Sequence, residues 1–216
     1  MTNEALFEIM QTIYAYYPVG LQPYADMYTG TAEWSRILGE KTDRIINGEN
    51  VAWSQFIEGL KTKYGANVVE DLSYRQFPSY TAHVQLFSEA TQQETCLIER
   101  NLVINVSLLG KYFTAFMEDR YIYKDYQNAG RNVHVAFYVL YNQQGRPDFK
   151  DDVSGIQQLL SPIFPDHKFV SHKTLFDIEV KDVVPYGIPV VKSSSCCIYH
   201  LLMSDFYHND SIRVFF

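Results

Sequence analysis

Cysteine is scarce in this chain, and its positions do not form a disulfide framework. The 216 residues include three cysteines, and two of them, Cys196 and Cys197, are adjacent. Disulfide-stabilised domains carry even sets of spaced cysteines. A chain of this length can also bury a sizeable hydrophobic core without cross-links. The sequence therefore predicts reduced thiols.

Long apolar runs and a targeting pattern are also missing. No stretch approaches the roughly 18 uninterrupted apolar residues that a membrane-spanning helix needs. Residues 1–10 carry Glu4 and Glu8 and no basic residue, which is the reverse of a secretory signal peptide. We therefore expect a cytoplasmic protein without a membrane partner.

Positive charge is sparse. The chain has 18 lysines and arginines against 25 acidic residues, which gives a net charge of −7, and no run of basic residues exceeds two. Such a surface repels phosphate backbones, so nucleic acid is not an expected partner. A basic partner protein, in contrast, would be attracted over a distance.

Sequence motifs for catalysis are absent as well. The glycines are isolated, so neither a phosphate-binding loop nor a dinucleotide fingerprint is present. The segment 152–155, Asp-Val-Ser-Gly, lacks the glycine that a nucleophile elbow places two residues before its serine. We predict no cofactor, and the sequence disfavours an enzyme.

Aromatic residues are abundant, in contrast. They make up 15% of the chain, with 17 tyrosines and 14 phenylalanines. Many of these rings are expected to line a β-rich core. Tyrosine is also enriched at protein interfaces because it is apolar along its ring and polar at its tip.

The first third of the chain has a helical pattern. Thr31 is suited to cap a helix that ends at Asn47-Gly48, and Asn50 begins another that stops at Gly65. A short helix is also predicted at 24–28. An earlier helix is indicated by apolar residues at helical spacing that stop before a proline: Leu6, Ile9, Met10, Ile13 and Tyr17.

In the middle of the chain, the sequence predicts a hairpin and also the register in which its two strands pair. Residues 96–108 alternate between apolar and polar side chains, and residues 111–125 return after Leu109-Gly110. A two-residue loop there pairs Glu99 with Arg120 and Arg100 with Asp119, which places opposite charges across the strands. A slip of one residue would place Glu99 against Asp119 and reverse both faces.

The remaining pattern predicts an α+β fold. An N-terminal helical layer is expected to cover one face of a mostly antiparallel, meander-like sheet, whose other face meets water. We predict a single domain over 1–216, mainly helical at 1–65 and mainly β at 66–216, with one further helix at 151–160. Further strands are predicted at 68–72, 80–87, 132–142, 174–182, 196–203 and 211–216.

The register also predicts which polar residues share the solvated sheet face. Glu118 and Arg120 lie on it with Glu99 and Asn101, and His134 and Tyr138 join them if the next strand keeps its valines on the core side. An acid, a histidine, a guanidinium and a phenol on adjacent strands can orient a small polar ligand or a partner's side chain. The binding face predicted here consists of Glu118, Arg120, His134 and Tyr138.

Two other polar clusters are weak metal candidates. Cys197 and His200 would point to opposite faces of a strand, which prevents joint coordination even with His208 nearby. The second cluster has no recognisable spacing of ligands. Its members are Asp166, His167, His172, Asp177 and Glu179.

Three functional hypotheses remain open. The first is a non-catalytic protein that binds another protein. The second is a small-ligand-binding or hydrolytic enzyme that uses the polar sheet face, and the third is a structural or assembly subunit with an uncovered strand edge. The layout of helices followed by a curved sheet, with acidic charge and many tyrosines, is similar to that of small bacterial immunity proteins. The resemblance implies an inhibitor that neutralises a toxin partner, and the net charge of −7 favours a basic one.

The first testable prediction is that folding does not depend on a metal ion. Incubation with a strong chelator should leave the melting temperature unchanged, because the cysteines and histidines lack joint geometry and the core is large enough alone. Thermal denaturation with and without chelator measures this. A fall of more than a few degrees that zinc restores would contradict it and implicate Cys197, His200 and His208.

Overall fold

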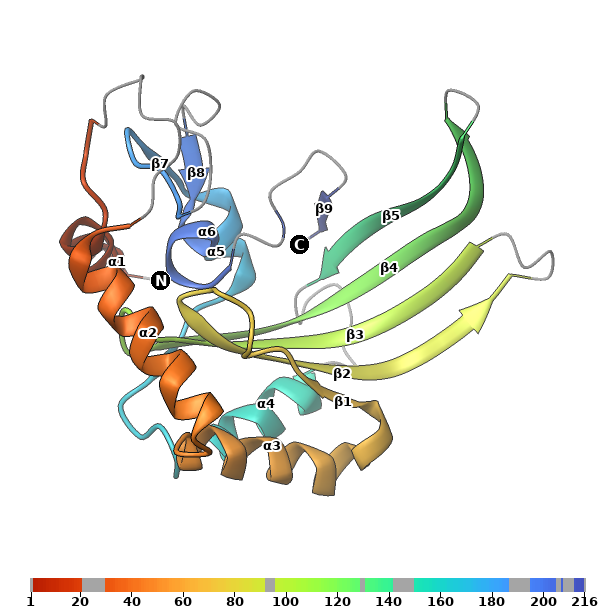
Figure 1. Ribbon diagram of the computed structural model, residues 1–216, viewed down its shortest axis with the longest axis horizontal. Coiled ribbons are helices and arrows are strands. Elements are labelled where there is room, and N and C mark those ends of the chain that lie inside the picture. The colour runs from red at the N-terminus through yellow and green to blue at the C-terminus, as the bar shows by residue number, and fades with distance from the viewer. Residues whose placement is uncertain are drawn as a thin grey trace.

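The computed structural model describes residues 2–20, 30–91, 96–128, 131–141, 150–186, 195–204, 207 and 212–215. Its centre is a mixed sheet with the strand order β1-β2-β3-β4-β5-β9, in which β6 also pairs with β4 (Figure 1). The strands of this sheet are β1 Val69–Asp71, β2 Ser79–Ala90, β3 Cys96–Ser107, β4 Tyr112–Asn128, β5 Arg131–Tyr141, β6 Lys168–Phe169 and β9 Ile212–Phe215.

Helices and a small second sheet surround this centre. Strands β7 (Glu179–Lys181) and β8 (Ser195–Cys197) pair with each other. The helices are α1 Asn3–Tyr16, α2 Ala32–Ile46, α3 Val51–Tyr64, the 3-10 turn η1 Ala66–Val68, α4 Lys150–Leu160, α5 His172–Asp177 and α6 Ile198–Leu202. The predicted α+β class is confirmed, and so are the meander from β1 to β5 and the helix near 151–160. No described helix is long and apolar enough to cross a membrane.

The N-terminal helices begin and end where local chemistry favours it. The side chains of Thr2 and Thr31 accept hydrogen bonds from backbone N–H groups in the first turns of α1 and α2. Gly48 and Gly65 follow α2 and α3 with φ angles of +69° and +103°, which residues with a Cβ rarely adopt. The predicted boundaries of these helices are therefore close to the observed ones.

The predicted register of the β3–β4 hairpin is confirmed. Glu99 lies opposite Arg120, and Arg100 lies opposite Asp119. The turn is wider than two residues, because β3 ends at Ser107 and the N–H of Leu108 bonds to the carbonyl of Pro78 at 2.8 Å. The charge pairs therefore set the register correctly although the turn differs.

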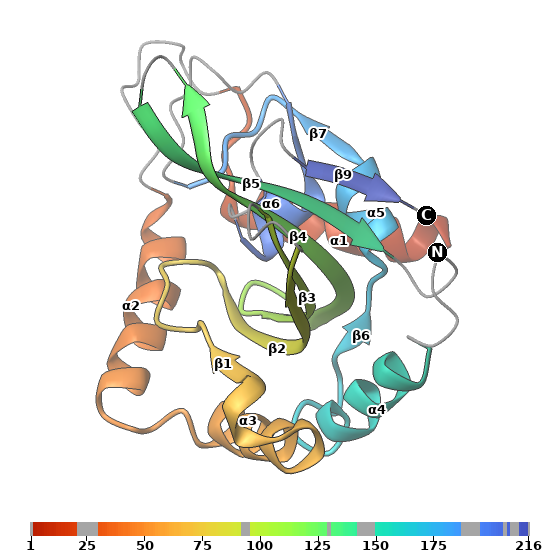
Figure 2. The same cartoon turned by 90° about the vertical axis from the view of Figure 1, so that its right-hand side faces the viewer.

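The sheet is covered on both faces at its base, which corrects the expectation of one solvated face. Figure 2 shows α3 and α4 on one side and α1, α5 and α6 on the other. Val103 and Phe116 pack with α1, α2 and α6, whereas Leu102 and Ile104 pack with α3 and α4. The N-terminal helices thus divide between the two faces.

Polar residues of the sheet base are used to hold helix α6. The carbonyl oxygens of residues 201–203, at the end of α6, accept hydrogen bonds from Tyr17, Ser107 and Ser79 at 2.6, 2.9 and 2.7 Å. The last carbonyls of a helix have no partner within it, so buried donors must come from elsewhere. The polar alternation of β3 therefore marks a helix-docking surface, not a surface in water.

Two predicted strands are wrong in type. Segment 174–182 forms most of α5 and then the short β7, and Ser171 caps α5 by accepting a bond from the N–H of Thr174 at 3.3 Å. Segment 196–203 begins with β8 but becomes α6 at Ile198. Short apolar segments do not distinguish a strand from a buried helical turn. The short helix predicted at 24–28 lies outside the described residues.

A buried lysine fastens the loop between β1 and β2 to α2. The side chain of Lys41 is buried, and its ammonium donates to the carbonyls of Arg75, Phe77 and Ser79 at 2.6, 2.8 and 3.2 Å. Burial lowers the pKa of Lys41 to about 8, so the group remains mainly protonated at pH 7. One charge thus satisfies two carbonyls of the loop and the carbonyl of the first residue of β2.

We predict that Lys41→Met lowers the free energy of unfolding by about 2 kcal/mol, because three carbonyls lose a charged donor in a buried place. Chemical denaturation at pH 7 measures this. The matched control is Lys61→Met, which removes a surface ion pair with Glu58 and should cost under about 0.5 kcal/mol. Equal losses in the two variants would contradict the role given to Lys41.

Candidate functional site

Glu118 is the most buried member of the predicted binding face. The β3–β4 register places it opposite Asn101, whose Nδ2 donates to Oε1 of Glu118 at 3.0 Å. The hydroxyl of Tyr207 donates to the other carboxyl oxygen. The side chain of Glu118 is 1% exposed. The expectation that Glu118 and Asn101 face solvent is therefore wrong, because both are buried and Tyr207 lies against Glu118.

The electrostatics of Glu118 follow from this burial. Burial raises the pKa of the Glu118 carboxyl above 4.5, although the hydrogen bonds from Tyr207 and Asn101 and the charge of Arg120 oppose the rise. Burial also raises the pKa of Tyr207 well above its usual value. Glu118 thus retains a proton to higher pH than an ordinary glutamate. Its two oxygens, however, accept hydrogen bonds from Asn101 and Tyr207, so the carboxyl serves to hold Tyr207 against the sheet.

Arg120 and Tyr138 meet as the sequence predicts. They are direct partners across β4 and β5, and the guanidinium lies 5.9 Å from the ring centroid of Tyr138. Arg120 also pairs with Glu99 at 3.5 Å, and 39% of its side chain is exposed. These three residues form a partly accessible rim beside the buried Glu118. His134 lies in β5, and its side chain is outside the described part of the chain.

A second histidine, not predicted from the sequence, lies on this face. His83 lies opposite Val103 in the β2–β3 ladder, so it shares the face of Asn101 and Glu118. Burial, with the charges of Arg75 and Arg120, lowers the pKa of His83 to about 4, which keeps it neutral at pH 7. His83 could have been found from the sequence, because it is a polar residue between apolar neighbours in β2. No residue close to Glu118 in sequence indicated that Tyr207 would bond to it.

On the opposite face, a second charge pair is partly buried. Arg100 donates through Nε and Nη2 to the two carboxyl oxygens of Asp119 at 2.6 and 2.9 Å. The Phe87 ring lies 5.8 Å from the guanidinium carbon. This two-bond geometry is the strongest form of an ion pair in proteins, and it stabilises the strands where they leave the core.

Beyond this pair the sheet continues as an arm, here defined as residues 85–90, 96–100, 119–128 and 131–137. Figure 1 shows it extending past the end of α3. None of its described side chains belongs to either core. On the same face as Arg100, the ladders place four residues that we name the arm face: Phe87, Ile98, Tyr121 and Tyr123. Phe87 and Tyr123 are each 40% exposed.

The adjacent thiols of Cys196 and Cys197 are poor nucleophiles. Cys196 and Cys197 are buried, and burial raises the pKa of Cys196 to about 12 and that of Cys197 to about 11. Cys197 and His200 were expected on opposite faces of a strand, but α6 begins between them, and Sγ of Cys197 lies 3.2 Å from Nδ1 of His200. The other nitrogen of His200 lies 3.1 Å from the carbonyl of Tyr207. The pair therefore links two segments of the core.

The cluster from Asp166 to Glu179 does not form a single site. Asp166 pairs with Lys111, and Asp177 pairs with Lys173. His172 is buried, with its ring centroid 5.9 Å from that of Phe116. Within the described ranges, no three histidine, cysteine or acidic side chains are grouped so as to hold a metal ion.

Comparisons with known proteins give no family for this chain. Neither protein-family models, nor curated proteins, nor solved structures contain a match. The functional argument therefore rests on the geometry of the chain itself.

We predict that Glu118 gives the stability a distinct pH dependence. The folded carboxyl holds its proton more tightly than the unfolded one, so its stabilising effect is complete below pH 4.5 and is lost as the pH rises through the folded pKa. The free energy of unfolding of the wild type, relative to Glu118→Gln, should thus fall from pH 4.5 towards neutrality. Urea denaturation across this range measures the difference.

Tyr207→Phe supplies the internal control for this pH effect. The Tyr207 hydrogen bond lowers the pKa of Glu118, so its removal should raise that pKa further. In the Tyr207→Phe background, the fall in the free energy of unfolding should begin at the same pH as in the wild type and continue to a higher pH. Parallel pH profiles for the wild type and Glu118→Gln would contradict the assignment.

Proposed function

We propose that this chain is a non-catalytic protein-binding protein, and that its arm contacts a basic partner protein. The observation that carries the proposal is the arm face, a cluster of apolar and aromatic side chains outside both cores. Exposed tyrosine and phenylalanine rings surrounded by polar residues are typical of protein interfaces. The ladders hold these side chains on a rigid sheet, so little conformational entropy is lost on binding.

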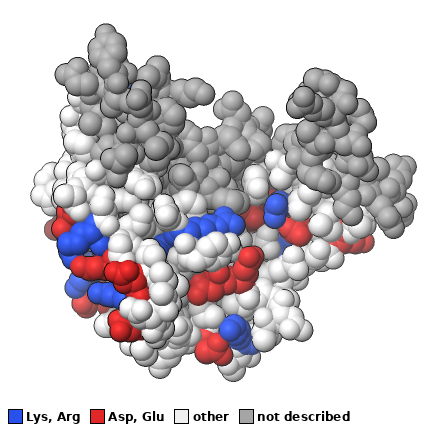
Figure 3. Space-filling model, viewed as in Figure 1, with Lys and Arg blue, Asp and Glu red and all other residues white. Residues whose placement is uncertain are grey.

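Charge supports a cationic partner. The net charge is −7, and such a charge raises the rate of encounter with a protein of opposite sign. On the face seen in Figure 3, acidic and basic side chains of the described residues are intermixed. The attraction we propose is therefore a long-range one from net charge, while contact is made by the arm face. An immunity-type inhibitor of a basic protein fits both features.

The enzyme alternative has less support. Glu118, the acid of the polar face, is buried and holds two hydrogen bonds from the protein. General acid–base catalysis needs a group that reaches the reacting atoms. The accessible part of that face is the rim of Arg120, Glu99 and Tyr138, which is suited to contact a partner's side chain.

The assembly alternative is favoured by one observation. Beyond Val84, the outer edge of β2 has no partner among the described strands. Open edges with apolar side chains can pair with a strand of another chain. Leu86 and Phe87 on this edge are 36% and 40% exposed. A second copy of the chain is the occupant under this alternative.

We predict that Phe87→Ser and Tyr123→Ser each weaken the partner complex by at least about tenfold, because buried aromatic anchors dominate interface energies. The partner is first captured on the immobilised wild type, and binding is then measured with the two purified proteins. The matched control is Tyr74→Ser, an exposed tyrosine in the loop between β1 and β2, which should bind normally. Circular dichroism should show all three variants folded.

Further measurements separate the alternatives. The association rate with the purified partner should fall as salt rises, because the attraction is screened over roughly 10 Å at 0.1 M. Arg120→Ala, on the rim of the opposite face, should also weaken the complex while the fold persists, because we propose that the partner reaches this rim as well as the arm face. Tyr138→Ala should weaken the complex too, but it should also cost stability because Tyr138 packs against the core. Retention on heparin or DNA at physiological salt would contradict a basic protein partner.

The oligomeric state of the isolated chain tests the assembly alternative. A dimer of the isolated chain that Phe87→Ser dissociates would favour assembly instead.

A further inference from the structure

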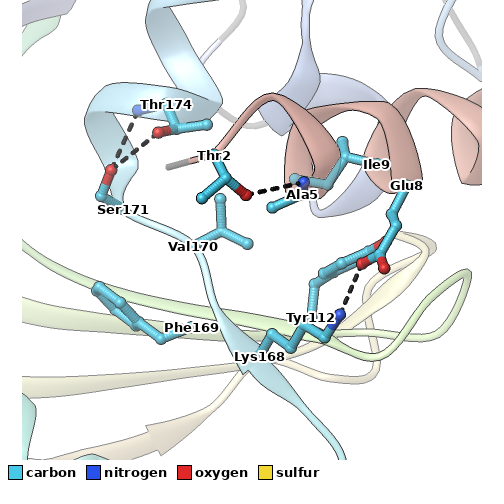
Figure 4. Close-up of a pocket in the computed structure, with 10 residues that line it drawn as sticks. All are labelled: Thr2, Ala5, Glu8, Ile9, Tyr112, Lys168, Phe169, Val170, Ser171 and Thr174. Carbon is cyan, nitrogen blue, oxygen red and sulfur yellow. Dashed lines mark hydrogen bonds and ion pairs between the residues drawn. The ribbon is translucent and has the colours of Figure 1, made fainter.

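A cavity of about 440 Å³ lies between the first half of α1 and the segment joining β6 to α5 (Figure 4). It lies at the opposite end of β4 from the arm, because Tyr112, the first residue of that strand, lines it. Its volume falls within the range of small-molecule sites. Apolar groups of Ala5, Ile9, Phe169, Val170 and the Tyr112 ring line it. The interior therefore suits the apolar body of a small ligand.

One cation lies at the mouth of this cavity. The ammonium of Lys168 pairs with Glu8 at 2.6 Å, and the two side chains are 61% and 43% exposed. Both residues also line a second, adjoining cavity of about 480 Å³, which places them where the two meet. An exposed pair of this kind contributes little stability. Two carboxylates on one ammonium would repel each other, so a ligand's carboxylate would take the place of Glu8, whose side chain is 43% exposed.

The hydroxyl groups of Thr2 and Thr174 can also donate hydrogen bonds to a ligand in the cavity. Oγ1 of Thr2 accepts from the N–H of Ala5 at 3.2 Å, and Oγ1 of Thr174 accepts from Ser171 at 3.1 Å. In both bonds the threonine oxygen is the acceptor, so these bonds leave its proton available. Lys168 and the two threonines therefore favour a ligand that presents acceptors. Figure 4 shows Val170 pointing between them towards α1.

We propose that this cavity binds a small monocarboxylic acid with an apolar body. The carboxylate bonds to the ammonium of Lys168 at the mouth, and the body lies against Ile9, Phe169 and Val170. A charged hydrogen bond at the mouth supplies selectivity, and removal of the apolar body from water supplies most of the affinity. This binding is independent of the arm interaction and requires no chemical step.

The test uses octanoate as the probe and octan-1-ol as its uncharged match, each titrated into the full chain and followed by NMR chemical shifts. Octanoate should shift resonances around Ile9, Phe169 and Val170. Lys168→Met should weaken octanoate binding by about tenfold, the effect of losing one charged hydrogen bond, and should leave octanol binding unchanged. The control Lys173→Met removes a lysine outside the cavity that pairs with Asp177.

A cavity-filling pair of variants tests the place of binding. Ala5→Phe fills the cavity from a half-buried position on α1 and should abolish octanoate binding. Ala15→Phe adds the same ring at an exposed position of α1 and should have no effect. The proposal is overturned if octanoate does not bind at millimolar concentrations, if Lys168→Met and Lys173→Met bind it equally, or if Ala15→Phe abolishes binding as well.

Discussion

Two charge pairs on opposite faces of the β3–β4 pairing hold the sheet in one register. Arg100 binds both oxygens of Asp119, and Glu99 pairs with Arg120 on the other side. Because side chains alternate between faces, a slip of one residue would break both pairs and exchange the two apolar rows. Each row packs on a different set of helices. The positions of α3 and α4 below the sheet and of α1 and α6 above it therefore depend on this register.

Local chemistry made part of the structure predictable. The caps at Thr31 and Gly65, the hairpin pairs and the helix near 151–160 all follow from residues close together in sequence. Whether each face of the sheet is covered or meets water was not predictable in this way. Ser107 looked solvated because nothing nearby shows that its partner is a carbonyl of α6, about a hundred residues away. Ser171, in contrast, was a local capping signal for α5 that the alternation of its neighbours obscured.

The candidate site shows the same division. The register predicted correctly that Arg120 and Tyr138 lie on one face with Glu118, but not that Tyr207 would cover the carboxyl. Much of the polar chemistry of the sheet thus holds the protein together: Glu118 binds Tyr207, and Ser79 binds the end of α6. The side chains of the arm face, in contrast, belong to neither core.

The position of β9 has a consequence for synthesis on the ribosome. This strand pairs with β5 in parallel, at the far end of the strand order from β1. Roughly seventy residues separate the two partners in sequence, which at about 5–20 residues per second takes on the order of 4–15 s to translate. During that interval the backbone edge of β5 is complete but lacks the β9 pairing. A nascent chain is then most exposed to pairing with a neighbouring strand, so slow translation of the last quarter would promote aggregation.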